Sequence, residues 1–342
     1  MRGFVRFLIA ACSAGAALFA LAMGVAAATL KPVATDRNDL IGEPRVYVTK
    51  SAENLLEIAR EFNVGYVAMV AANPEVDPWL PGDGTALTLP TVHLLPNTAR
   101  RGIVINLSEM RLYYFRPDEA VISFPIGIGS EGRETLVGTT RVVSKRPNPT
   151  WYPPPAKRAE DPDLPAAVPP GPDNPLGDFA LYLGWPRYLI HGTNRPYGVG
   201  RRLSAGCIRL YPEDIARLYP MVPIGTPVTV IDEPVKLGWS NGDLYLEIHP
   251  TQAQADELED KRRFTTRVID SLVERIKQAA GGHAGRLDWE LVAHAAKDRR
   301  GVPVKITRLP QAAVSAWPGL LLAHPLLHHL LHLVGRSLRI GR

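Results

Sequence analysis

The chain has 342 residues, enough for two or three domains of ordinary size. Its formal net charge of +5 comes entirely from its two ends, where Arg2 and Arg6 open the chain and Arg336, Arg339 and Arg342 close it. The body between them carries no net charge, which excludes the basic footprint of a nucleic-acid-binding protein, and no repeat of solenoid period is present.

Residues 1–28 have the pattern of an export signal. Two arginines precede the apolar stretch FLIAACSAGAALFALAMGV, and Ala26, Ala27 and Ala28 match the small residues that signal peptidase reads. We expect export, cleavage after Ala28 and a linker over residues 29–44. Two alternatives remain: an uncleaved anchor, because the apolar run is nearly long enough to cross a bilayer, and a lipid anchor on Cys12.

Only two cysteines are present, Cys12 and Cys207. Cleavage of the signal would leave Cys207 as a lone thiol in an oxidising compartment, where thiols are usually paired. Such a thiol is either a small buried core residue or a reactive group. The sequence around Cys207 is therefore needed to distinguish a buried core thiol from a reactive one.

Residues 45–90 show a strand, helix, helix, strand pattern. RVYVTK and TALTLP are typical of strands, and NLLEIAREFN and VGYVAMVAANP are typical of amphipathic helices. Six positions are predicted to lie in the core: Val46, Leu56, Ile58, Ala59, Val67 and Leu87.

The same stretch, VYVTKSAENLLEIAREFNVGYVAMVAANPEVDPWLPGDGTALTLP, resembles a LysM domain. LysM domains are small modules that bind the N-acetylglucosamine-containing glycan of cell walls. Glu53 and Asn54 replace the more common Asp-Thr pair of the family. If sugar is bound, the loops around 63–66 and 73–79 are the expected contact sites.

Residues 101–232 predict a mostly β domain. GIVINLSEMRLYYF, AVISFPIGIG, TTRVVSKR, ALYLG, YLIHG and PVTVID are β-rich and are separated by Gly, Pro and Asn turns. Between them lies NPTWYPPPAKRAEDPDLPAAVPPGPDNPLG, where we expect neither helix nor strand because proline is too frequent. This segment is either a lid over a neighbouring site or a surface connector.

Residues 239–309 predict a small helical accessory module. GDLYLEIHP leads into one long polar helix, TQAQADELEDKRRFTTRVIDSLVERIKQ, which is followed by the helix DWELVAHAAKDR and the short strand PVKITR. Six residues are predicted to pack in this module: Leu244, Leu246, Phe264, Val268, Leu272 and Ile276. The Leu- and His-rich tail over 310–342 predicts a helix that docks on the protein or on a membrane; zinc binding by His328 and His332 is the alternative.

A cysteine nucleophile needs a base, because a free thiol is only slightly ionised at neutral pH. His191 is the only one of the nine histidines that lies inside the β-rich unit, at the end of the strand YLI and the start of a glycine turn. A side chain at a strand end is better placed for a site than for a core. Cys207 and His191 are therefore the candidate nucleophile and base.

The stretch LIHGTNRPYGVGRRLSAGCIRLYPEDI closely resembles the L,D-transpeptidase (YkuD-like) catalytic domain, especially the ErfK/YbiS subgroup of periplasmic enzymes. GIVINLSEMRLYYF, GRETLVGTTRVV, NPTWYPPP and PGPDNPLG resemble the same subgroup. The resemblance covers about residues 43–309. It implies a mostly β fold, in which a β-sandwich-like catalytic domain over 101–232 follows a small α/β LysM-like domain over 45–90 and precedes the helical module.

The resemblance implies a role for each polar group around the thiol. Cys207 would be the acyl-accepting nucleophile, His191 its general base, and the Gly192 carbonyl the group that orients the imidazole. The N–H groups of Gly206 and Cys207 would form the oxyanion hole, supported by Ser204. Substrate contacts are expected from five residues: Arg209, Asn194, Tyr197, Arg202 and Trp151.

One position departs from the family pattern, since Ala205 stands where members usually have histidine. Because His191 is kept, we expect activity at a reduced rate. By resemblance the partners are the stem peptides and glycan of peptidoglycan, and no cofactor, metal or nucleic acid is expected.

The reaction implied by the resemblance is an acyl transfer in the periplasm. Cys207 would form a thioester with the diaminopimelate carbonyl of a tetrapeptide stem. An amine of a second stem, giving a 3-3 cross-link, or of an outer-membrane lipoprotein would then resolve it. The alternatives are a catalytically impaired peptidoglycan-binding protein and a hydrolase that uses the same cysteine.

Overall fold

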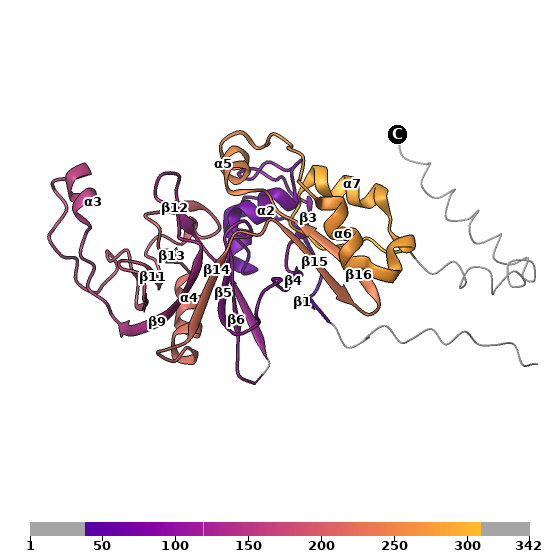
Figure 1. Ribbon diagram of the computed structural model, residues 1–342. Coiled ribbons are helices and arrows are strands. Elements are labelled where there is room, and N and C mark those ends of the chain that lie inside the picture. The colour runs from indigo at the N-terminus through magenta and orange to yellow at the C-terminus, as the bar shows by residue number, and fades with distance from the viewer. Residues whose placement is uncertain (1–37, 119, 309–342) are drawn as a thin grey trace, which may run out of the picture. The chain divides into compact units, whose positions relative to one another are not determined.

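The computed structural model describes residues 38–118 and 120–308 (Figure 1). The predicted export signal over 1–28 and the Leu- and His-rich tail over 310–342 lie outside the described residues. Among the helices of the described part, none has the length and apolar character needed to cross a bilayer.

The predicted strand, helix, helix, strand order is present over residues 45–90. The elements are β2 (Arg45–Val48), α1 (Leu55–Glu61), α2 (Tyr66–Ala72) and β3 (Ala86–Leu89), and β2 pairs antiparallel with β3. Asn54 caps α1, because its side-chain oxygen accepts the N–H of Glu57 at 3.0 Å.

The prediction of Val46 as a core residue is wrong. Strand side chains alternate between two faces, and on β2 it is Tyr47 that packs against the core while 72 % of Val46 is exposed. Ile58, Ala59, Val67 and Leu87 are buried as predicted, and Leu56 is half-buried at the edge of the core.

Residues 101–232 fold around one eight-stranded mixed sheet, which confirms the mostly β prediction (Figure 1). Its order is β13, β11, β10, β9, β14, β5, β6, β7. The strands are β5 (Gly102–Asn106), β6 (Arg111–Phe115), β7 (Val121–Pro125), β9 (Gly138–Pro147), β10 (Phe179–Leu183), β11 (Leu189–His191), β13 (Ile208–Arg209) and β14 (Pro227–Ile231). The β5–β14 and β11–β13 pairs are parallel and the others antiparallel.

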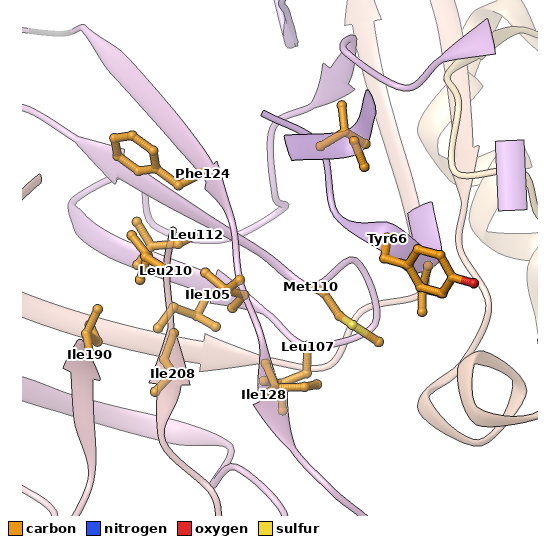
Figure 2. Close-up of a cluster of buried hydrophobic side chains, with 14 of the residues drawn as sticks. Tyr66, Ile105, Leu107, Met110, Leu112, Phe124, Ile128, Ile190, Ile208 and Leu210 are labelled. Atoms are coloured by element: carbon orange, nitrogen blue, oxygen red, sulfur yellow. The ribbon is translucent and has the colours of Figure 1, made fainter. Parts of the chain in front are cut away.

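One face of this sheet carries the main hydrophobic core (Figure 2). Ile105, Leu112, Phe124, Ile190 and Ile208 come from five different strands and are fully buried together. The helix α4 (Pro212–Met221) adds Ile215 and Leu218 to the same core. This packing fixes which face of each strand points inward, and so which residues of β11 and β13 are left for the opposite face.

The proline-rich segment contains a short helix, contrary to prediction. α3 (Pro155–Glu160) begins at a proline, and the first turn of a helix tolerates proline because its N–H groups have no partner inside the helix there. Trp151 and Val168 exchange backbone hydrogen bonds of 2.9 and 2.8 Å across the segment. These bonds give the segment a fixed base.

The last described part combines a three-stranded sheet with helices. β15 (Val235–Ser240), β16 (Asp243–Ile248) and β17 (Val304–Lys305) are antiparallel, and β17 and the helix α7 (Trp289–Asp298) lie where the sequence predicts them. This part also contains the helix α6 (Leu272–Ala280) and the 3-10 helix η2 (Gly281–Arg286). Earlier in the chain, β1 (Leu40–Ile41) and β4 (His93–Leu94) form a separate strand pair.

The single long helix predicted over 251–278 is instead two helices, α5 (Gln252–Lys261) and α6. Arg262 ends α5 in the left-handed conformation, with φ of 58°. The side chains of Gln254 and Arg299 donate to the carbonyls of Thr265 and Arg267, so these backbone groups are satisfied outside a helix. Val268 is 91 % exposed, so its prediction as a packing residue is wrong.

Candidate functional site

The candidate base and nucleophile lie on or next to two paired parallel strands. β11 and β13 pair with Ile190 opposite Ile208 and with His191 opposite Arg209. The two isoleucines point into the core (Figure 2), so His191 and Arg209 point to the other face of the sheet. Cys207 directly precedes β13, and the same alternation places its side chain on the face of His191 and Arg209.

The His191 imidazole is held in one orientation. It is buried, and its Nδ1 lies 2.6 Å from the carbonyl oxygen of Gly192, the contact that the resemblance implies. A carbonyl can only accept, so Nδ1 carries the proton and Nε2 keeps its lone pair. This tautomer is the one that a general base requires.

The surroundings of His191 keep it neutral. Burial lowers its pKa, and the positive charge of Arg209 lowers it further, to about 4. The backbone groups of Gly192 and Leu176 favour the protonated imidazolium and so act in the opposite direction, but they do not compensate. At neutral pH the imidazole is therefore uncharged and able to accept a proton.

The Cys207 thiol is also protonated at neutral pH. Burial raises the pKa of the thiol, while a hydrogen bond from the backbone of Leu189 and the charge of Arg209 partly oppose this. Its Sγ donates to the carbonyl of Arg187 at 3.4 Å, and within the described chain no hydrogen bond joins it to His191. The thiol hydrogen must turn from the Arg187 carbonyl toward the imidazole before His191 can take it, and catalytic hydrogen bonds commonly tighten only when substrate is bound.

Ser204 fixes the turn that carries the nucleophile. Its Oγ accepts the N–H of Gly206 at 3.1 Å and donates to the carbonyl of Cys207 at 2.6 Å. The Gly206 N–H, expected in the oxyanion hole, is therefore not free in this structure. Gly206 has φ of +101°, and a Cβ there would lie 3.0 Å from Tyr188 Cε1, so the turn requires glycine.

Arg209 is a largely buried cation without a protein counterion. Its Nε has no hydrogen-bond partner, and no carboxylate in the described ranges forms an ion pair with it. Burial lowers the pKa of the guanidinium, and the thiolate form of Cys207 acts in the opposite direction; arginine remains charged at any physiological pH. A buried, unpaired guanidinium beside the thiol suits a substrate carboxylate.

The other expected substrate contacts are dispersed. Asn194 donates to the carbonyl of Pro172 at 3.2 Å, and Tyr197 is half exposed on the 3-10 helix η1 (Pro196–Gly198). Trp151 holds the base of the proline-rich segment. The structure does not bring Arg202 to the site, because its guanidinium is buried in an ion pair with Asp256 of α5 and also donates to the carbonyl of Gln252.

Sequence reasoning missed three residues that touch the nucleophile turn. Arg187 offers its carbonyl to the thiol, Tyr188 packs against Gly206, and Thr135 donates to the carbonyl of Gly206 at 2.9 Å. Thr135 lies in the quoted run GRETLVG, but it is 71 residues from its partner. No local pattern could have paired them.

A buried charged cluster lies elsewhere in the chain. Side-chain ligand atoms of His93, Glu109 and Glu247 come within 4.8 Å of one another, a grouping that could hold a metal ion. The Lys236 ammonium, however, lies 2.9 Å from a carboxylate oxygen of each glutamate. It supplies the positive charge that two buried carboxylates need, so the cluster is an ion-pair network.

Of the two loops expected to contact glycan, one is covered. In the loop 63–66, the Val64 carbonyl accepts the hydroxyl of Tyr211 at 3.1 Å, and Gly65 packs against Gly200. The loop 73–79 is open instead, with Trp79 half exposed beside Tyr66 at a ring distance of 6.0 Å.

Comparison with known proteins shows which family the catalytic part resembles. Residues 100–230 match the catalytic domain of L,D-transpeptidases, of the YkuD type. The chain is 40 % identical over 304 residues to the probable L,D-transpeptidase YcfS of Escherichia coli K12, covering 86 % of this chain and 92 % of the relative.

Two further relatives from the same strain are similar over most of their length. The probable L,D-transpeptidase YbiS is 40 % identical over 308 residues, covering 84 % of this chain and 97 % of the relative. The probable L,D-transpeptidase ErfK/SrfK is 42 % identical over 267 residues, covering 75 % and 83 %. Among solved structures, the catalytic domain of the Enterococcus faecium L,D-transpeptidase is 23 % identical, covers 40 % of this chain and 100 % of that domain, and has a TM-score of 0.32.

Proposed function

The chain belongs to the L,D-transpeptidase family, and on that basis we propose that it is a periplasmic, cysteine-dependent enzyme acting on the tetrapeptide stems of peptidoglycan. In this proposal Cys207 forms a thioester with the carbonyl of diaminopimelate. The acyl group then passes to an amine, either of a second stem or of an outer-membrane lipoprotein.

The acylation half-reaction uses the neutral pair on the face of β11 and β13. His191 Nε2 takes the thiol proton as Sγ attacks the diaminopimelate carbonyl, whose oxygen becomes an oxyanion. The C–N bond to the terminal D-alanine then breaks, and the imidazolium of His191 gives its proton to the departing amine. D-Alanine leaves and the thioester remains on Cys207.

The transfer half-reaction runs the same proton path in reverse. An acceptor amine attacks the thioester and His191 removes its proton. Collapse of the second oxyanion forms the new amide bond and releases the sulfur, which regains its proton from His191. One peptide bond is broken and one is formed, so the cycle needs no cofactor.

The observation that carries the proposal is the register of β11 against β13. It places His191 opposite Arg209 on the face away from the core, beside the strand that Cys207 directly precedes. The pKa of about 4 for His191 supports its role, because a base must be uncharged before it can accept.

Arg209 gives the site a preference for anionic substrates. Its guanidinium lacks a carboxylate partner among the described residues, and a stem peptide presents carboxylates next to the bond that is cleaved. We assign Arg209 to one of these carboxylates, which would hold the scissile carbonyl near Cys207.

The part over residues 45–90 is proposed to bind the glycan strand. Its open loop 73–79 presents the exposed face of Trp79, and an indole ring can stack on a sugar ring. Binding there would keep the catalytic part near its polymeric substrate.

The test is the muropeptide profile of isolated sacculi after incubation with the wild-type protein and with Cys207→Ala. The proposal predicts loss of tetrapeptides, release of D-alanine and new 3-3 dimers or lipoprotein-linked tripeptides, all dependent on Cys207. Released stems without a new linkage would instead identify a hydrolase. An unchanged profile with retained binding to sacculi would identify a wall-binding protein without activity.

A further inference from the structure

We propose that Thr135 is a positioning residue for acyl transfer: its hydroxyl fixes the peptide unit between Gly206 and Cys207, and so the direction of the Cys207 N–H that stabilises the oxyanion. The inference rests on the proposed role of Cys207. It extends that proposal to a residue of a different loop, 71 residues away in the chain.

The hydroxyl of Thr135 joins two backbone groups. Its Oγ1 accepts the N–H of Gly129 at 3.0 Å and donates to the carbonyl of Gly206 at 2.9 Å. The side chain is only 4 % exposed, so water does not compete for either bond. Because the oxygen is held by Gly129, its single proton is directed at Gly206.

The Gly206 carbonyl and the Cys207 N–H belong to the same planar unit. All described peptide bonds are trans, and in a trans peptide the C=O and N–H bonds point in opposite directions. Holding the carbonyl at Thr135 therefore aims the Cys207 N–H away from Thr135. A donor aimed before the reaction begins has no reorganisation to undergo when charge develops on the substrate oxygen.

Three other backbone groups of the turn are already engaged. Ser204 takes the Gly206 N–H and the Cys207 carbonyl, and Thr135 takes the Gly206 carbonyl. None of these three hydrogen bonds uses the Cys207 N–H. These hydrogen bonds hold the backbone of the turn in place and leave the Cys207 N–H available for another acceptor, which we assign as the oxyanion.

The loop that presents Thr135 is itself rigidly attached to the turn. β8 (Ile128–Gly129) pairs in parallel with β12 (Arg202–Ser204), and the Ser130 N–H donates to the Ser204 carbonyl at 3.0 Å. A Cβ on Gly129 would lie 2.2 Å from the Arg133 carbonyl oxygen, so the loop folds back tightly over that glycine. The folded backbone of this loop therefore fixes the position of the Thr135 hydroxyl.

The experiment compares two reactions of the same thiol in the full-length protein. Acylation by imipenem passes through an oxyanion, whereas alkylation by iodoacetamide does not. Stopped-flow measurements would give the acylation rate constant and the dissociation constant of the preceding complex for wild type, Thr135→Val and Thr135→Ser. Valine keeps the shape without the hydroxyl, and serine keeps the hydroxyl without the methyl group.

We expect Thr135→Val to slow acylation by about 10- to 100-fold, less than the loss of a whole oxyanion donor. Its dissociation constant and its alkylation rate should stay within about twofold of wild type, and Thr135→Ser should restore acylation to within about threefold. Thr135→Val acylating at the wild-type rate would overturn the inference. So would an equal loss of acylation and alkylation, which marks a merely structural role.

The same data distinguish a failure of the proposed role of Cys207 from a failure of the role of Thr135. If wild type is alkylated at Cys207 but never acylated, Cys207 is not an acyl-accepting nucleophile, and the role of Thr135 falls with it. If wild type is acylated and the valine variant behaves identically, only the role of Thr135 is refuted.

Discussion

His191 and Arg209 face each other across the parallel strands β11 and β13, and the charge of the arginine helps to keep the imidazole neutral. The same guanidinium favours the thiolate form of Cys207, which lies two residues before it. Arg209 thus acts on both partners of the proton transfer. It lowers the pKa of His191, which keeps the imidazole uncharged and able to accept a proton. It also partly offsets the effect of burial, which raises the pKa of the thiol.

Replacing Arg209 with glutamine should shift both titrations upward. The pKa of His191 should rise from about 4, because the nearby positive charge that penalises the imidazolium is gone. The midpoint of the pH profile for iodoacetamide alkylation of Cys207 should also rise, because the thiolate loses its neighbouring cation. NMR titration measures the pKa of His191, and alkylation rates from pH 6 to 10 follow the titration of the Cys207 thiol.

Arg195→Gln is the matched control, since Arg195 is an exposed arginine that acts on Arg209 rather than on His191 or Cys207. It should leave both titrations in place. A His191 pKa that is the same in wild type and Arg209→Gln would refute the electrostatic role of Arg209.

Ala205→His should raise the rate of acylation by a carbapenem. Ala205 is exposed beside the nucleophile turn, so a larger side chain can be accommodated, and histidine adds a donor near the developing oxyanion. We expect an increase of about tenfold or more. Ala205→Leu adds bulk without a donor and should not accelerate the reaction; a slower Ala205→His enzyme would mean that the pocket has been reshaped around alanine.

Gly200→Ala should destabilise the contact between residues 63–66 and the catalytic part. Gly200 has φ of +75°, and a Cβ there would lie 2.2 Å from the Tyr66 nitrogen. We expect a loss of roughly 2 to 4 kcal/mol in the free energy of unfolding, measured by chemical denaturation.

Gly84→Ala separates backbone strain from the steric clash. Gly84 has the same φ of +75°, but a Cβ there would meet nothing within 4 Å. It should cost about 1 kcal/mol, which is the conformational cost alone. Equal losses in the two variants would show that the close approach of Gly200 to Tyr66 contributes nothing.

Asp214→Asn should stabilise the protein above pH 7 and have little effect below pH 4. Burial, and then the charge of Glu213, raise the pKa of Asp214 from 3.8 to about 7. Its Oδ1 accepts from Asn63 Nδ2 at 3.0 Å, while Asp214 Oδ2 and Asn63 Oδ1 have no partner. Protonation of Asp214 would give Oδ2 a hydrogen to donate to that amide oxygen, and the asparagine variant would carry such a donor at every pH.

The sign of this effect follows from linkage. Because the pKa is raised in the folded state, the stabilising contribution of Asp214 is complete below about pH 4 and is lost as the pH rises to about 7. Thermal or urea unfolding from pH 4 to 8 should therefore show a variant advantage that grows with pH, to between about 1 and 4 kcal/mol. An advantage that is constant with pH would contradict the assignment.

The sequence predicted the parts of the site that local patterns encode. His191 ends an apolar strand before a glycine, and its place at a strand end follows from that pattern alone. The contacts of Ser204 and Thr135 with the turn are different, because side-chain hydrogen bonds to backbone depend on how loops fold. The GRETLVG run carries no periodicity that points to Gly206.

In the fold, too, local patterns predicted some elements, while tertiary contacts determined others. Hydrophobic alternation identified the strands of the main sheet, but it could not show that Tyr47 rather than Val46 faces the core of a two-stranded unit. Helical spacing over 251–278 predicted one helix. The spacing contains no sign that the side chains of Gln254 and Arg299 bind the backbone between α5 and α6. These tertiary hydrogen bonds satisfy the backbone at the break.

The most direct test of the account is the rate of acylation by a carbapenem, followed by intact-protein mass spectrometry, in wild type and in His191→Gln, with Cys207→Ser as the control. The account predicts one adduct on wild type, none on the serine variant, and a rate at least about 100-fold lower when the imidazole is removed. A glutamine variant that is acylated as fast as wild type would show that His191 does not take the proton of Cys207.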